Sequence, residues 1–317
     1  MTAAFRSLLL RHETILGFLL VVALVILAFQ SDRFFTADNL LNQGRLMAEV
    51  GLVALAMTFV IVTGGIDLSV GSILGLVAIL LGVFWQKLGI PLPAAMVLGI
   101  LAGGVAGLVN GLIITRFGVP PLIATLATLA LYRGLAEGIS QARSVRGYPD
   151  WFFTLGQGEV LGVPTQLWIF AILAATAAVI LGLSTFGRAT YAIGANAVAS
   201  RFSGLSVDRT LLLIYTASGL VAGLAAVIFV SRVSTTRSDM GTGLELDVIT
   251  AVVLGGTSIF GGRGTIIGTL LGLVLMQALK NGLALAGVKG DGTIVVIGAV
   301  LIGTILLSNI FRKDADG

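Results

Sequence analysis

The chain of 317 residues contains no cysteine, one histidine and few charged residues, and each shortage excludes a class of protein. Without cysteine there is neither a disulfide framework nor a thiolate catalyst or metal ligand. The single histidine, His12, has no second histidine with which to chelate a metal ion. Charged residues make up 11% of the chain, against about a quarter in ordinary soluble domains, which is too few to cover a water-soluble globule.

Apolar residues and glycine are abundant instead. Hydrophobic residues account for 57% of the chain, the mean hydropathy is +1.06, and there are 43 glycines. Membrane helices use glycine to pack backbone against backbone. The composition therefore predicts an all-α, polytopic transmembrane helical bundle. The net charge of +4 comes from basic residues scattered singly at the ends of apolar runs, which indicates contact with membrane lipid and not with nucleic acid.

Apolar runs long enough to cross a bilayer follow one another along the sequence. About 20 apolar residues are needed for one crossing, and the runs predict about ten spans, with nine as the alternative. The predicted spans are residues 15–30, 46–63, 67–85, 93–115, 121–140, 166–184, 209–231, 246–260, 265–286 and 292–310. The run 246–260 is short and ends in glycines, so a re-entrant segment or a half-helix is expected there. No linker interrupts the runs, so residues 1–317 are predicted to form one transmembrane domain.

The positions of the charged residues give the expected orientation. Basic residues are divided almost equally between the two sides, so the positive-inside rule does not decide by itself. A cytoplasmic C-terminus places the basic pair Arg312 and Lys313 inside, and with about ten spans the N-terminus is then cytoplasmic as well. In this orientation residues 141–165 and 231–247 form outer loops, and residues 185–208 form an inner loop.

The segment 63–72 separates two apolar runs and reads Thr-Gly-Gly-Ile-Asp-Leu-Ser-Val-Gly-Ser. An intramembrane aspartate costs roughly 2.5–3.5 kcal/mol on insertion scales, so Asp67 needs a partner or water. One interpretation is a helix break at Gly64 and Gly65 that faces a water-accessible pathway together with Asp67 and Ser69. The other is that Asp67 or Ser69 caps the helix that follows, and the two interpretations are compatible.

A second glycine-rich interruption covers residues 254–265 and includes Gly255, Gly256 and Thr257. A phosphate-binding loop of the Walker type ends in Gly-Lys-Ser/Thr, and no Gly-Lys pair occurs in the chain. No nucleotide site is therefore expected in this chain. Close helix packing or a broken helix is the better interpretation of these glycines.

The inner loop, residues 185–208, contains a short predicted helix. Asn196 is a good N-cap and Gly204 a good residue just past the C-terminus, and together they bracket about two turns. The apolar residues of this helix fall on one side: Val198, Phe202 and Leu205. Such a face needs a cover, which is either the chain's own bundle or the lipid interface, or a cytosolic partner that receives it as a helix in a groove.

Five motifs occur in a characteristic order, at residues 64–71, 110–111, 120–126, 133–134 and 251–258. As a set they resemble the membrane permeases of bacterial ABC importers for simple sugars, of which the ribose, rhamnose and autoinducer-2 permeases are examples. The resemblance runs from about residue 45 to 310. It implies an inner-membrane subunit that works as a homodimer or heterodimer and passes a monosaccharide-like solute inward by alternating access. It also implies a periplasmic binding protein that delivers the solute and a separate cytosolic ATPase that supplies the energy.

In this family the loop that matches residues 187–206 carries the helix that docks on the ATPase. An acidic residue often follows the asparagine, and here that position is Ala197. The residues expected at the contact are Asn196, Arg201, Phe202, Ser203 and Gly204. The glycine breaks at residues 64–65 and 255–262 are expected to let the bundle rearrange.

Two other kinds of transporter remain open. A branched-chain amino-acid ABC permease has the same architecture, although the Ile-Asp-Leu-Ser run at 66–69 favours the sugar branch. A secondary transporter driven by an ion gradient would place ionisable residues at the membrane midplane, where Asp67 is the only obvious candidate. A membrane enzyme is disfavoured, because the sequence shows no paired carboxylates, histidine cluster or Gly-x-Ser-x-Gly elbow. No catalytic residue, metal or cofactor is expected.

Overall fold

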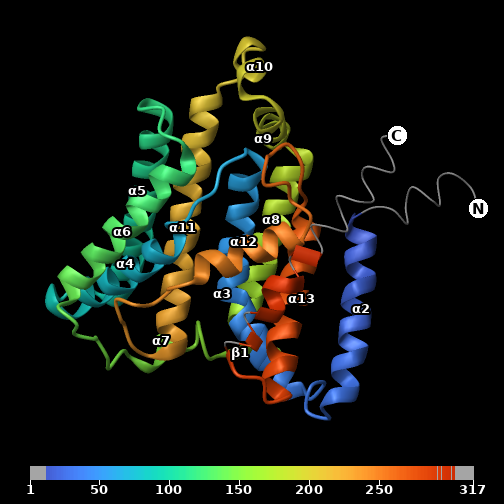
Figure 1. The fold of residues 1–317 in the computed structure, drawn as a ribbon. Coiled ribbons are helices and arrows are strands. Elements are labelled where there is room, and N and C mark those ends of the chain that lie inside the picture. The colour runs from blue at the N-terminus through green and yellow to red at the C-terminus, as the bar shows by residue number, and fades with distance from the viewer. Residues whose placement is uncertain (1–11, 291, 294, 301, 304–317) are drawn as a thin grey trace, which may run out of the picture.

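The computed structural model describes residues 12–290, 292–293, 295–300 and 302–303, and these residues are mostly helical (Figure 1). The longer helices are α2 (His12–Gln30), α3 (Ala37–Val62), α4 (Val70–Gly82) with the π-helix η1 (Val83–Lys87), α5 (Leu92–Arg116), α6 (Pro121–Ser140), α8 (Thr165–Leu183), α11 (Val207–Val233) and α13 (Ile266–Leu285). The shorter elements are α7 (Asp150–Phe153), β1 (Glu159–Val160), β2 (Val163–Pro164), α9 (Thr185–Ala195), α10 (Ala197–Phe202) and α12 (Leu244–Leu254). The prediction of an all-α polytopic bundle is confirmed.

Within the described residues, eight helical segments are long and apolar enough to cross a membrane. Ten spans were predicted, and two of the predicted runs account for the difference. The run 246–260 forms only the 11-residue helix α12, so the expectation of a half-helix there is confirmed and that of a full span is wrong. The run 292–310 lies partly outside the described residues. Its described residues, 292–293, 295–300 and 302–303, are helical.

The path of the chain around α12 explains how so short a helix fits the bundle. In Figure 1, α11 and α13 both run from the end of the molecule that carries α10 toward the end that carries α7. The chain therefore has to return between them, and it does so through the loop after α11, then α12 at middle depth, then the glycine-rich loop before α13. Residues 234–265 make one crossing without a full-length helix.

Helix α3 begins at Ala37, earlier than the predicted start near residue 46. Polar side chains in its first turns form hydrogen bonds with side chains of α13, so this part of α3 can pack inside the bundle. The amide of Asn39 exchanges hydrogen bonds with that of Asn281 at 2.9 and 3.0 Å, and Gln277 donates to Gln43 at 2.7 Å. Pairing across two helices satisfies amide groups that are costly to leave unpaired in lipid.

Helix α11 packs against α3, α4 and α5, and glycines bring α5 especially close to it. A Cβ added at Gly107 would lie 2.1 Å from the carbonyl oxygen of Tyr215, and one added at Gly219 would lie 2.1 Å from that of Gly103. Neither position has room for a side chain. The high glycine content thus serves backbone-to-backbone packing of membrane helices, as the composition predicts.

Candidate functional site

The first helix break lies between α3 and α4. Helix α3 ends at Val62, and Gly64 has the left-handed conformation, with φ of +81°. The amide of Gly65 donates to the carbonyl of Val60 at 3.1 Å, and that of Gly64 donates to Ile61 at 2.8 Å. This pair of bonds is a Schellman motif, which closes a helix when glycine follows its last turn.

Asp67 lies in the turn after this break and is completely buried. One carboxylate oxygen accepts hydrogen bonds from the amide and hydroxyl of Ser69, at 3.0 and 2.6 Å, and the other accepts from the hydroxyl of Ser218 on α11 at 3.1 Å. The hydroxyl of Ser69 in turn accepts from the side-chain amide of Asn110 on α5 at 2.7 Å. The turn is therefore tied to α11 through Asp67 and to α5 through Ser69.

These contacts bear on the capping interpretation of Ser69 and Asp67. Asp67 accepts from the amide of Ser69, the residue that precedes α4. Ser69 precedes α4 but its side chain caps none of the amides of that helix, so the capping role proposed for it is wrong. Its hydroxyl is used by Asp67 instead. Asp67 is enclosed in this conformation, which gives it the protein partners that an intramembrane carboxylate requires. A role in a solute pathway stays a prediction.

The second break follows α12 and has the same local geometry as the first. Gly256 has φ of +88°, and the amide of Thr257 donates to the carbonyl of Val252 at 3.2 Å. Gly255 packs against α13, where an added Cβ would lie 2.4 Å from the carbonyl oxygen of Gly268. Both a broken helix and close packing are thus present. The buried hydroxyl of Thr257 has no hydrogen-bond partner in the described part of the chain.

The two breaks touch each other. The amide of Gly262, in the loop after α12, donates to the carbonyl of Val62 at the end of α3, at 2.8 Å. A Cβ added at Gly261 would lie 2.8 Å from the amide nitrogen of Gly64. We call this contact of Val62 and Gly64 with Gly261 and Gly262 the glycine junction.

Helix α9 rests directly on the glycine junction. A Cβ added at Gly194 would lie 1.8 Å from the carbonyl oxygen of Val62 and 2.5 Å from the amide nitrogen of Gly262. The hydroxyl of Tyr191 donates to the carbonyl of Gly264 at 2.6 Å. The last turn of α9 is therefore held against both breaks by backbone contact, without an intervening side chain at Gly194.

The short helix predicted in the inner loop is present as α10. The side chain of Asn196 accepts from the amide of Ala199 at 2.9 Å, and Gly204 has φ of +83°. The amide of Leu205 donates to the carbonyl of Ser200 at 3.0 Å, which completes the C-terminal cap. Helix α9, which directly precedes α10, was not predicted.

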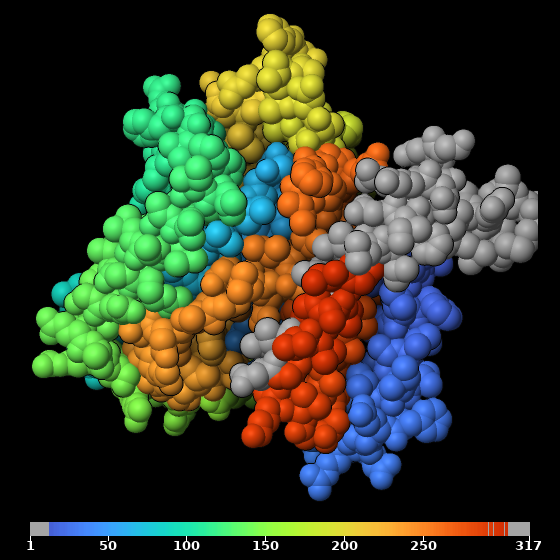
Figure 2. Space-filling model, viewed as in Figure 1, coloured from blue at the N-terminus to red at the C-terminus, as the bar shows by residue number. Residues whose placement is uncertain are grey.

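The apolar face of α10 is open. Phe202 is 90% exposed and Val198 64% exposed, whereas Ser200 on the other side is buried. Helices α9 and α10 protrude from one end of the bundle (Figures 1 and 2). Arg201 forms an ion pair with Asp208 at the start of α11, with one bond of 2.9 Å, so this residue also fixes α10 to the bundle.

Two ionisable residues inside the spans besides Asp67, Glu49 and Arg133, have partners on other elements. Neither was predicted from the sequence as a site residue. Glu49 in the middle of α3 is 4% exposed and accepts two hydrogen bonds from Arg232 on α11, at 2.6 and 3.0 Å. Arg133 on α6 donates to the carbonyls of Ser238 and Met240 in the loop before α12, the latter at 2.9 Å. A single charged residue within an apolar run is the sequence feature that indicates such a paired position.

Long apolar helices with glycine breaks and buried charged side chains are typical of polytopic membrane transport proteins. The family model described as the permease component of the branched-chain amino acid transport system matches residues 39–305. The chain belongs to this permease family and is therefore a transport component.

Several characterised import permeases are similar over almost their full length. The ribose import permease of Bacillus subtilis (strain 168) is 41% identical over 298 residues, covering 93% of this chain and 92% of that protein. The ribose import permease of Escherichia coli (strain K12) is 38% identical over 307 residues, covering 95% and 94%. The autoinducer 2 import system permease of Photorhabdus luminescens is 37% identical over 296 residues, covering 92% and 89%. No solved structure matches the chain. The resemblance to simple-sugar import permeases is confirmed.

Proposed function

We propose that this chain is the permease subunit of an ATP-driven ABC importer that moves a monosaccharide-like solute inward across the bacterial inner membrane. The observation that carries the mechanism is the contact of α9 with the glycine junction. The exposed helix α10 begins three residues after Gly194, the residue of α9 that lies against the point where both helix breaks meet. A protein that moves α10 moves this point directly.

Helix α10 has the properties of a docking element for the ATPase. Its exposed Phe202 and Val198 offer apolar anchors at helical spacing, which fits a helix received by a groove. Asn196, Ser203 and Gly204 hold the ends of the helix, and Arg201 fixes it to α11. The docking loop, residues 185–208, is therefore expected to move as one rigid body. An ATPase bound to it lies in the cytoplasm.

Alternating access follows from the contact of the docking loop with the glycine junction at Gly194. Closely packed elements switch between discrete arrangements and do not deform continuously. A displacement of α9 transmitted through Gly194 shifts the end of α3 and the loop after α12 together. The half-helix α12 and the turn that contains Asp67 are then repositioned, which opens the bundle on one side and closes it on the other. Gly64, Gly65, Asp67, Ser69, Gly255, Gly256 and Thr257 are the residues assigned to this movement.

The remaining partners follow from this assignment. The nucleotide site belongs to the ATPase and not to this chain. A second permease copy, identical or related, pairs with this one in the membrane, and a periplasmic binding protein delivers the solute to the end of the molecule that carries α7. Both chain termini then lie in the cytoplasm.

Reconstitution tests the proposal. The permease is incorporated into proteoliposomes with its ATPase and binding protein, and uptake of labelled ribose, rhamnose and leucine is measured with and without ATP. We expect ATP-dependent uptake of a sugar. Uptake of leucine alone would assign the chain to the amino-acid branch, whose name the family model bears. Uptake that persists without ATP and is abolished by an uncoupler would identify an ion-coupled carrier and overturn the proposal.

A further inference from the structure

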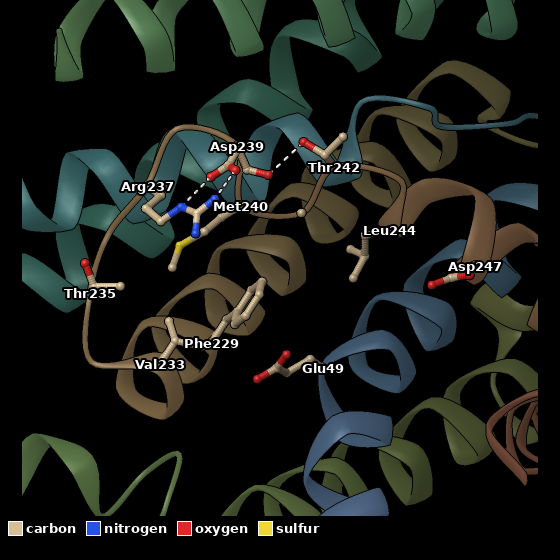
Figure 3. Close-up of a pocket in the computed structure, with 11 residues that line it drawn as sticks. Glu49, Phe229, Val233, Thr235, Arg237, Asp239, Met240, Thr242, Leu244 and Asp247 are labelled. Carbon is tan, nitrogen blue, oxygen red and sulfur yellow. Dashed lines mark hydrogen bonds and ion pairs between the residues drawn. The ribbon is translucent and has the colours of Figure 1, made fainter. Parts of the chain in front are cut away.

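A cavity of about 360 Å³ lies between α3, α11, α12 and the loop that joins α11 to α12. Figure 3 shows Glu49, Phe229, Leu244 and Asp247 arranged around this space, with the loop residues along one side. Its volume falls within the range of roughly 300–1,000 Å³ typical of small-molecule sites. None of the residues predicted for the solute pathway from the sequence lines it.

The charged side chains that line the cavity all have partners of opposite charge. Glu49 is paired with Arg232, Asp247 is paired with Lys280 at 2.6 Å, and Asp239 is paired with Arg237 within the lining itself. The cavity wall therefore contains several charged side chains, and each of them is neutralised by a partner of opposite charge.

The pairing of the charged side chains favours a neutral solute over a charged one. A free amino acid would bring a carboxylate and an ammonium group, each needing an unpaired partner once water is removed. A neutral polyol brings hydroxyl groups, which donate to carboxylate oxygens whose acceptor sites are not all used by one cation. The ring of Phe229 adds an apolar surface of the kind that small-molecule pockets combine with a few polar groups.

The cavity also adjoins the moving parts proposed above. Its lining residue Gly241 packs on the first turn of α4, where a Cβ added at Gly71 would lie 2.3 Å from the Gly241 carbonyl oxygen. Arg133 holds the same loop through the carbonyl of Met240. The loop therefore connects the cavity wall to the helix that follows the first break.

We propose that this cavity is a binding subsite for an uncharged, polyhydroxylated solute of monosaccharide size, on the side of the permease from which the solute enters. The proposal rests on the function proposed above. Glu49 and Asp247 accept hydrogen bonds from solute hydroxyls.

The absence of cysteine from the chain provides a direct test. Thr242→Cys places a single thiol in the cavity wall, and Thr154→Cys serves as the matched control outside it. Both threonines are exposed, and each donates its hydroxyl at 2.7 Å to the carbonyl three residues earlier. The rate at which a membrane-impermeant maleimide labels the permease is measured in reconstituted vesicles, with ribose or leucine present.

Ribose should slow labelling of Thr242→Cys by about tenfold when its concentration is about ten times its dissociation constant. It should leave Thr154→Cys unaffected, and leucine should protect neither. Adding Asp247→Asn to Thr242→Cys should weaken the protection. Should that second change prevent folding, the single-cysteine comparison still decides.

ATP-driven uptake measured in the same vesicles separates this proposal from the proposed function. Uptake of ribose without protection of Thr242→Cys overturns the cavity assignment and leaves the proposed function intact. Protection without any uptake supports the cavity assignment and overturns the proposed function. Protection by leucine and not by ribose overturns the assigned solute chemistry.

Discussion

The amide of Gly262 donates a hydrogen bond of 2.8 Å to the carbonyl oxygen of Val62, and this bond joins the two interrupted helices of the bundle. Each interruption is closed by the same pattern of backbone bonds around a left-handed glycine, Gly64 in one and Gly256 in the other. Gly194 of α9 lies against the joining bond itself. A surface helix and two buried breaks thus share one contact, which makes the contact a suitable place to test mechanical coupling.

Gly194→Ala should impair transport. The added methyl group would lie 1.8 Å from the carbonyl oxygen of Val62, so α9 has to move away from the glycine junction. Overpacking of this kind costs about 1–3 kcal/mol. We expect a lower melting temperature in detergent and a loss of ATP-driven uptake.

Gly182→Ala on α8 is the control for this change. An added Cβ meets no atom within 4 Å there, and alanine favours the helix over glycine by about 0.5–1 kcal/mol. Its uptake should equal that of the unmodified protein. Normal uptake by Gly194→Ala as well would show that α9 does not transmit movement through this contact.

Asp67→Ala should destabilise the protein and reduce transport. The change removes three hydrogen bonds and leaves the hydroxyls of Ser69 and Ser218 buried without their acceptor. Hydrogen bonds to a charged group contribute about 1.5–3 kcal/mol each to stability. Asp67→Asn keeps the size but loses the charge, so a smaller reduction is expected.

Thermal unfolding and uptake are measured together for the Asp67 variants, with Ser218→Ala as the partial control. Ser218→Ala removes only the bond to α11. Its effect should lie between those of the unmodified protein and Asp67→Ala. Full activity and normal expression of Asp67→Asn would show that the charge of Asp67 is needed for neither transport nor assembly.

The double variant Arg201→Ala, Phe202→Ala should fold normally but uncouple ATP hydrolysis from uptake. Both side chains are exposed, and surface changes usually alter stability by less than about 0.5 kcal/mol. The loss of Phe202 removes the most exposed apolar side chain of α10. ATP hydrolysis by the assembled complex and solute uptake are measured in the same vesicles.

Asp208→Asn separates the two roles of Arg201 in that experiment. It breaks the ion pair with Arg201 and leaves the exposed face of α10 unchanged. An exposed pair of this kind contributes about 0.2–1 kcal/mol, so coupling should persist. Normal uptake by the double variant would remove the docking assignment from α10.

The features that were predicted correctly from the sequence depend on neighbouring residues. Asn196 and Gly204 were recognised as the ends of α10 because capping is decided within a few positions. The break at Gly64 was recognised because paired glycines interrupt an apolar run. In each case the local sequence contains all the residues that make the hydrogen bonds.

The features that were missed depend on residues far apart in the chain. Glu49 has no local partner, and its ion pair with Arg232 follows only from the packing of α3 on α11. Gly194 looks like any helical glycine until α9 is placed against Val62. Asn39 was left out of the second span because its partner, Asn281, lies near the other end of the chain. Apolar periodicity predicts helices, but it does not predict which helices pair.

Glu49→Gln should destabilise the protein more than the simultaneous change of both partners. The single change leaves the guanidinium of Arg232 partly buried without its carboxylate, 5.0 Å from the ring of Phe229. Breaking a buried ion pair from one side costs about 3–5 kcal/mol, and partial exposure of Arg232 places the expected loss below that range.

The double variant Glu49→Gln, Arg232→Gln removes both charges and should recover part of the lost stability, because two neutral amides replace an unpaired cation. Melting temperatures of the two single variants and the double variant form a mutant cycle that isolates the pairwise term. A coupling of zero would show that α3 and α11 are held together without this pair. If stability recovers in the double variant while uptake does not, the Glu49–Arg232 pair is needed for transport beyond its contribution to stability, which agrees with the place of Glu49 in the cavity wall.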